Sequence, residues 1–160
     1  MLRIHRKQRA STGRGAQDLA TGASLTELVA FQYSGGLWNK NQAESLAPLA
    51  ALPKLQELVL MNLRVKEEGL RPLGECKTLQ TLAASNQFET ADYACLSVVL
   101  RHVKCEFFAP WTRVKSAFGG DTMIIGKRKP ILSLTRDAEK IRDYEKAFRR
   151  LQAHFSSNTL

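Results

Sequence analysis

Apolar residues form two similar copies of one pattern in the middle of the chain. The six apolar positions of the first copy return 24 residues later in the second: Leu46, Leu49, Leu52, Leu55, Leu58 and Leu60 correspond to Leu70, Leu73, Cys76, Leu79, Leu82 and Ala84. The early positions are three residues apart, which is typical of a short helical segment, and the last ones alternate, which is typical of a strand. Because one such unit cannot bury its own apolar side, we expect the copies to stack with their strands side by side.

Weaker copies of the pattern flank the strong pair. They are two triplets: Leu25, Leu28 and Ala30 before the pair, and Leu100, Val103 and Cys105 after it. The middle residues of successive strand segments then fall at positions 28, 58, 82 and 103, at intervals of 30, 24 and 21 residues. The long first interval contains SGGLWNKN, residues 34–41, whose glycines and asparagines predict an inserted turn or loop.

A strand with a helical return in such a short repeat resembles the leucine-rich repeat. The predicted fold class is therefore α/β: a leucine-rich-repeat solenoid of about four repeats and a fragment. Short parallel strands would form its concave face, and short helical or 3-10 segments its convex face. An amphipathic helical hairpin with the same leucine spacing is the alternative. The asparagine that is usual after the last leucine of the repeat is displaced, since Asn62 and Asn86 come one position early.

The two ends of the chain extend this prediction. The segment Met1–His5 alternates apolar and polar residues like the strand of an incomplete repeat, so we expect 1–18 to be a partial repeat or a disordered basic segment. A chain that begins inside a repeat is expected to be a fragment of a longer protein or a shortened product, and its strand edge invites self-association. Residues 19–111 would form the repeat domain. Residues 112–160 would form a C-terminal cap, with an amphipathic helix over 135–154 that begins at Thr135.

Several segments are similar to short bacterial leucine-rich-repeat proteins. These segments are GGLWNKN, the repeat core LPKLQELVL, FAPW, and GKRKPIL with the helix that follows it. The resemblance covers about residues 25–151. It implies a non-enzymatic repeat domain that binds other proteins through its concave face, and it assigns no catalytic residue.

Charge and cysteine usage add little to this interpretation. The net charge is +9, and it belongs to the ends: residues 1–16 carry five basic and no acidic residues, and residues 101–160 carry thirteen basic and six acidic ones. Three cysteines without close pairing argue against a disulfide framework and favour a reducing, cytoplasmic location. No apolar run is long enough for a membrane helix, and no apolar segment follows the basic start as in a secretory signal.

The candidate binding site is the concave face. If the leucines point inward, the alternate strand residues line this face: Glu27, Val29, Phe31, Glu57, Val59, Met61, Thr81, Ser85, His102, Lys104 and Glu106. Phe31, Val59 and Met61 would form an apolar centre suited to an unidentified protein partner. The alternative is that the short solenoid curls, or that the terminal helix covers these side chains.

Other chemistries are less favoured by the sequence. The basic loop Lys127, Arg128 and Lys129, together with the terminal helix, suggests a module associated with nucleic acid, but the helix also carries four acidic residues. His102 and Cys105 supply only two candidate metal ligands, and as a catalytic pair they would face opposite sides of a strand. We therefore expect no enzyme activity, no metal and no cofactor.

Overall fold

The fold is described from a computed structural model, which defines residues 27–34, 41–116 and 120–158. The chain divides into two compact units. Unit 1 comprises residues 1–85 and 102–105, and unit 2 comprises residues 86–101 and 106–160. The segment expected to form a partial first repeat, 1–18, lies outside the described residues, as does most of the predicted loop 34–41.

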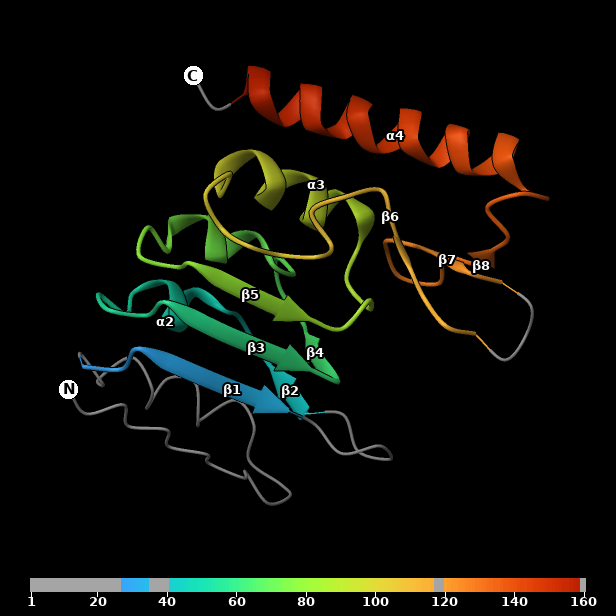
Figure 1. Cartoon of the computed structure of the whole chain (residues 1–160). Coiled ribbons are helices and arrows are strands. Elements are labelled where there is room, and N and C mark those ends of the chain that lie inside the picture. The colour runs from blue at the N-terminus through green and yellow to red at the C-terminus, as the bar shows by residue number, and fades with distance from the viewer. Residues whose placement is uncertain (1–26, 35–40, 117–119, 159–160) are drawn as a thin grey trace. The chain divides into compact units, whose positions relative to one another are not determined.

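Unit 1 contains two parallel sheets. Strands β1 (Ala30–Ser34), β3 (Glu57–Met61) and β5 (Thr81–Ala84) form the larger sheet in the order β1-β3-β5 (Figure 1). Strands β2 (Asn41–Ala43) and β4 (Leu63–Val65) form a separate pair. The four-residue helix α2 (Ala47–Ala50) precedes β3, the 3-10 helix η1 (Arg71–Glu75) precedes β5, and these two helices contact each other.

The repeated leucines explain why β3 and β5 pair. Leu58 lies beside Leu82 and Leu60 beside Ala84, so the 24-residue spacing of the sequence is the register of these two strands. The apolar positions of both copies are at most 6% exposed: Leu46, Leu49, Leu52, Leu55, Leu58, Leu60, Leu70, Leu73, Cys76, Leu79, Leu82 and Ala84. Unit 1 is thus built around stacked leucine rows, as expected from burial of apolar side chains.

Unit 2 combines two helices with a small antiparallel sheet. The helices are α3 (Thr90–Val99) and α4 (Ala138–Ser157), which pack against each other. The sheet consists of β6 (Trp111–Arg113), β7 (Thr122–Ile124) and β8 (Ile131–Leu132), in that order (Figure 1). Its apolar side belongs to a core in which Ile124, Leu132 and Ile141 are buried, with Trp111, Leu134 and Tyr144 packed against them.

The prediction of a leucine-rich-repeat solenoid is wrong. The described residues form three separate sheets, one of them antiparallel, and the fold is a mixed α/β arrangement. The physical reason lies after β5, where Tyr93, Leu96 and Leu100 follow helical spacing and are fully buried along and just beyond α3. The last predicted repeat is therefore divided, because Leu100 belongs to unit 2 and Val103 to unit 1.

The prediction that the C-terminal helix caps a solenoid is also wrong, because the described residues form no such solenoid. The sequence places this helix over 135–154 as the cap of a solenoid, whereas α4 packs inside unit 2 on α3 and on the core next to β7 and β8. It begins after Asp137, not at Thr135. Asp137 accepts a hydrogen bond from the backbone N–H of Ser133 at 3.0 Å, and its own N–H donates to the Ser133 carbonyl at 2.9 Å. This turn delays the start of the helix.

Candidate functional site

The outward side of the β1-β3-β5 sheet brings together residues from three strands. We call it the exposed sheet face, and it consists of Ala30, Gln32, Ser34, Glu57, Val59, Met61, Thr81 and Ala83. These residues alternate with the residues of the leucine side, as the period of a strand requires. Val59 and Met61, on the central strand, are half-buried, whereas Gln32, Glu57 and Thr81 around them are exposed. The face therefore has a small apolar centre and a polar margin.

Four of the predicted binding residues lie on this face, namely Glu57, Val59, Met61 and Thr81, but Phe31 does not. Phe31 lies beside Leu58, on the leucine side, and stacks on Tyr33 with ring centroids 6.2 Å apart. The predicted interval between the first two strands is 30 residues and the observed register is 27, since Ala30 pairs with Glu57. A shift by an odd number of residues moves a side chain to the opposite face of a strand.

The same shift in register explains why the sequence prediction did not include Gln32 and Ser34 of β1 in the binding face. Gln32 lies beside Val59, and Ser34 beside Met61, so these two polar residues occupy the positions expected for β1 side chains on the binding face. Glu27 and Val29 precede β1: Glu27 forms an ion pair with Lys54 at 2.7 Å, and Val29 is 45% exposed. No feature of the sequence fixes the register between β1 and β3. Residues 34–41, which lengthen the interval between these strands, have no apolar pattern of their own.

The remaining predicted residues divide between the two units. Lys104 forms an isolated parallel bridge with Thr81, so it extends the exposed sheet face by one position. His102 is exposed two residues earlier. Ser85 follows β5, and its hydroxyl accepts a hydrogen bond from the N–H of Asn62 at 3.2 Å. Glu106 belongs to unit 2, where it accepts a hydrogen bond from the Thr112 hydroxyl.

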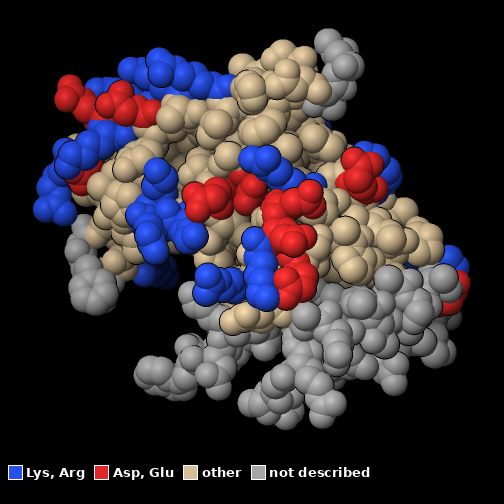
Figure 2. Space-filling view, turned by 180° about the vertical axis from the view of Figure 1, so that it is seen from behind, with Lys and Arg blue, Asp and Glu red and all other residues tan. Residues whose placement is uncertain are grey.

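A second surface lies at the turn between β7 and β8. Lys127, Arg128 and Lys129, which we call the hairpin tip, are all exposed. The Lys127 ammonium lies 3.5 Å from a Glu89 carboxylate oxygen, and the Lys129 ammonium lies 5.2 Å from the centre of the Tyr144 ring on α4. Figure 2 shows further Lys and Arg side chains along α4, with Asp and Glu beside them. The basic loop and the terminal helix singled out in the sequence therefore meet within unit 2.

Side chains before and within α3 hold the start of this turn. The Asn86 amide donates to the Ile124 carbonyl at 2.9 Å, and its oxygen accepts from the Gly126 N–H at 2.7 Å. The Thr90 hydroxyl donates to the Ile125 carbonyl at 3.0 Å. Gly126 has a φ of +130°, which favours glycine, and a Cβ there would lie 2.0 Å from the Thr90 hydroxyl oxygen. The turn is thus held by side-chain bonds to three consecutive residues.

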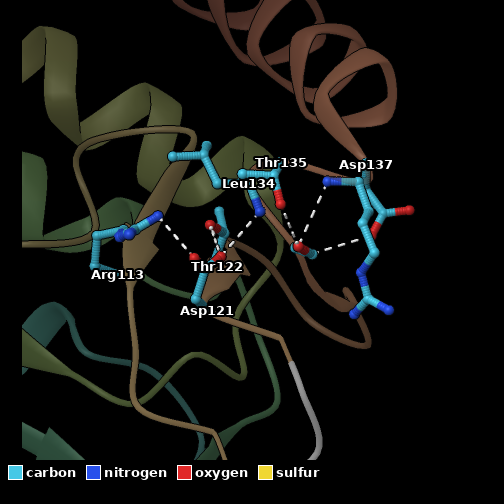
Figure 3. Close-up of polar contacts among 8 residues, drawn as sticks. Arg113, Asp121, Thr122, Leu134, Thr135 and Asp137 are labelled. Atoms are coloured by element: carbon cyan, nitrogen blue, oxygen red, sulfur yellow. Dashed lines mark hydrogen bonds and ion pairs between the residues drawn. The ribbon is translucent and has the colours of Figure 1, made fainter.

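Two carboxylates of unit 2, those of Asp121 and Asp137, bind backbone N–H groups of the connection from β8 to α4 (Figure 3). Asp121 accepts hydrogen bonds from the Leu134 N–H and the Thr122 hydroxyl, both at 2.9 Å, and pairs with Arg113 at 3.0 Å. The Leu134 N–H is the main cause of a lowered pKa for Asp121. The pKa of Asp137 is also lowered, mainly by the Ser133 N–H. Both carboxylates are therefore stabilised as anions that fix loops, whereas a general acid near neutral pH needs a raised pKa.

Comparison with protein-family models, with curated proteins and with solved structures found no match to this chain. Within the described ranges, no three His, Cys, Asp or Glu side chains gather as a metal site would require. Across the same part of the chain, no helix is both long enough and apolar enough to cross a membrane. The exposed sheet face and the hairpin tip are therefore the two candidate sites of this chain.

Proposed function

We propose that the chain is a protein-binding module whose exposed sheet face receives an apolar segment of another protein. The observation that supports this proposal is that Val59 and Met61 lie next to each other on the outward side of the central strand β3. Ala83 of β5 lies beside Val59. Their neighbours are small or polar and mostly uncharged, so a partner can approach without burying unpaired charges. Charge is found only at one end of the face, on Glu57 and Lys104.

The size of the face limits the kind of partner. Strands lie about 4.8 Å apart and each strand residue adds about 3.3 Å, so three strands of up to five residues present roughly 14 Å by 17 Å. A standard interface buries about 800 Å² on each partner, which is several times this area. A short peptide segment or one helix face fits these dimensions better than a large folded surface does.

The energetics point in the same direction. Complete burial of a Val or Met side chain contributes about 1.5–3 kcal/mol, and both are already half-buried in the free protein. Association costs about 4 kcal/mol or more in lost freedom of movement. The two apolar side chains alone therefore support weak, reversible binding, and contacts at the polar margin must supply the remainder.

The experiment that tests the proposal is site-specific photo-crosslinking. A benzophenone amino acid replaces Met61 in one version of the chain and Glu75 in another, because Glu75 is exposed on η1 and lies outside the sheet face. We expect a discrete protein adduct from position 61 that persists at high salt, and none from position 75. Adding Val59→Glu to the first version should abolish the adduct. Equal yields from both positions, or no adduct from position 61, would contradict the proposal.

A further inference from the structure

The hairpin tip presents three consecutive exposed cations on unit 2. Unit 2 carries twelve Lys and Arg residues against eight Asp and Glu, an excess of four positive charges. We propose that the hairpin tip contacts the phosphate backbone of a nucleic acid and that Arg128 is its main contact residue. The tip belongs to unit 2 and the exposed sheet face to unit 1, so this inference does not depend on the proposed function.

The three cations of the tip are not equivalent. Lys127 pairs with Glu89, its backbone N–H donates to the Phe88 carbonyl at 2.7 Å, and Lys129 lies over the Tyr144 ring. Arg128 lies between them and makes no hydrogen bond or ion pair with any residue that the structure describes. Its guanidinium is therefore available for a ligand, and it can bind a phosphate through two parallel hydrogen bonds.

The backbone of Arg128 supports a role in binding. Its φ is +58°, in the left-handed region that glycine and asparagine adopt more readily than arginine. A residue in this conformation that could be replaced by glycine with less strain is a candidate for function. The strain is sustained by the bonds from Asn86 and Thr90 to the preceding residues of the turn. Because these bonds hold the turn in place before a ligand binds, binding does not include the free-energy cost of ordering the turn.

Exposed cations of α4 form a second basic surface on unit 2, on another side of the helix from Tyr144 and the tip. Lys146 and Arg149 follow Arg142 at spacings of four and three residues, so these three share one side of the helix, and Arg150 follows directly. Arg142 and Lys146 form only exposed ion pairs with Glu139 and Asp143, at 3.9 and 3.5 Å. Exposed pairs of this kind contribute little to stability, so phosphates can replace the carboxylates.

The arrangement favours a nucleic acid over a membrane or an acidic peptide. Membrane binding by an amphipathic helix requires an exposed apolar face, but Ile141 and Phe148 of α4 are buried within unit 2. The Arg142 side of α4 lies well away from Tyr144, which the tip contacts, so the cations are spread over more than one side of the helix. An extended chain of closely spaced phosphates can reach such separated cations, whereas a short peptide reaches one side.

The test is fluorescence anisotropy with the full chain and labelled single-stranded RNA, single-stranded DNA and duplex DNA of about 20 nucleotides, between about 50 and 200 mM salt. We expect affinity to fall with salt. Arg128→Gly should weaken binding about three- to tenfold and reduce the slope of log affinity against log salt by about one. Its melting temperature should be equal to or above that of the wild type, because glycine accepts the positive φ. The preferred form among the three oligonucleotides identifies the kind of nucleic acid.

Two comparisons make the result decisive. Arg64→Ala removes the same charge from an exposed position of β4 in unit 1 and should leave the affinity unchanged. Equal losses for Arg64→Ala and Arg128→Gly would show that only overall charge matters and would overturn the proposal. It would also be overturned if the oligonucleotides failed to bind, or if anionic lipid vesicles or a poly-glutamate peptide bound as tightly and with the same dependence on Arg128.

Discussion

The substitution Gly126→Ala tests how the hairpin is held in place. The added Cβ would lie 2.0 Å from the Thr90 hydroxyl oxygen, and the backbone would retain a φ of +130°. Residues in such conformations carry about 1–3 kcal/mol of strain, and displacement of the hydroxyl breaks its bond to the Ile125 carbonyl, worth about 0.5–1.5 kcal/mol. We therefore expect the free energy of unfolding of unit 2 to fall by about 2–4 kcal/mol.

A double-mutant cycle with Thr90→Ala separates the two contributions. Alone, Thr90→Ala should cost about 0.5–1.5 kcal/mol, because only the hydrogen bond to Ile125 is lost. In the Gly126→Ala background it should cost almost nothing, since the bond is already broken and the backbone strain remains. The two substitutions are thus expected to be non-additive by about 1 kcal/mol.

The assay is guanidinium unfolding followed by Trp111 fluorescence and by far-ultraviolet circular dichroism. Trp38→Phe in every variant makes Trp111 the only tryptophan, so that its signal reports unit 2. Two results would refute the reasoning. One is a loss below about 0.5 kcal/mol for Gly126→Ala, the size of a neutral surface change. The other is strict additivity with Thr90→Ala, which would mean that the two side chains do not compete for space.

Three further predictions concern the core, acid stability and the Asn86 bonds. Leu58→Ala should cost about 2–5 kcal/mol because Leu58 is fully buried, whereas Val59→Ala on the outward side should cost less than about 1 kcal/mol; urea unfolding compares them. The folded-state pKa of Asp121 and of Asp137 lies below the ordinary 3.8, so their contribution to stability is present above that pH and is lost as the pH falls below it. Asp121→Asn should therefore reduce the acid sensitivity of the melting temperature between about pH 4 and pH 2, and an unchanged pH profile would argue against this. Asn86→Ala should cost about 1–3 kcal/mol in unit 2, measured by the same fluorescence assay, because it leaves two backbone groups without their partner.

Local leucine spacing predicted part of unit 1 from the sequence. The 24-residue interval correctly places Leu58 beside Leu82, because two strands with the same apolar pattern bury their leucines best in that register. The same reasoning failed for β1, where apolar residues occur in succession and allow more than one alignment. The observed register of 27 residues brings Gln32, not Val29, beside Val59, and it places Phe31 beside Leu58.

Unit 2 was harder to predict because its elements are short or depend on distant partners. Strands of two and three residues, such as β8 and β6, give too few positions for an alternating pattern to be recognised. Residues 90–99 carry helical spacing, but extending the leucine repeat to Cys105 assigned this segment to a solenoid. The long terminal helix was predicted within three residues at each end, because its apolar stripe continues over several turns.

The central proposal is that Val59 and Met61 form a binding surface and not part of the core. The most direct measurement is a calorimetric titration of the partner captured by crosslinking, with the wild-type chain, with Met61→Ser and with Glu75→Gln as the control. We predict that Met61→Ser weakens the affinity at least fivefold while the melting temperature stays within about 2 °C of the wild type, a shift that corresponds to about 0.5–1 kcal/mol. An unchanged affinity for Met61→Ser, or a loss of affinity that only accompanies unfolding, would contradict the account.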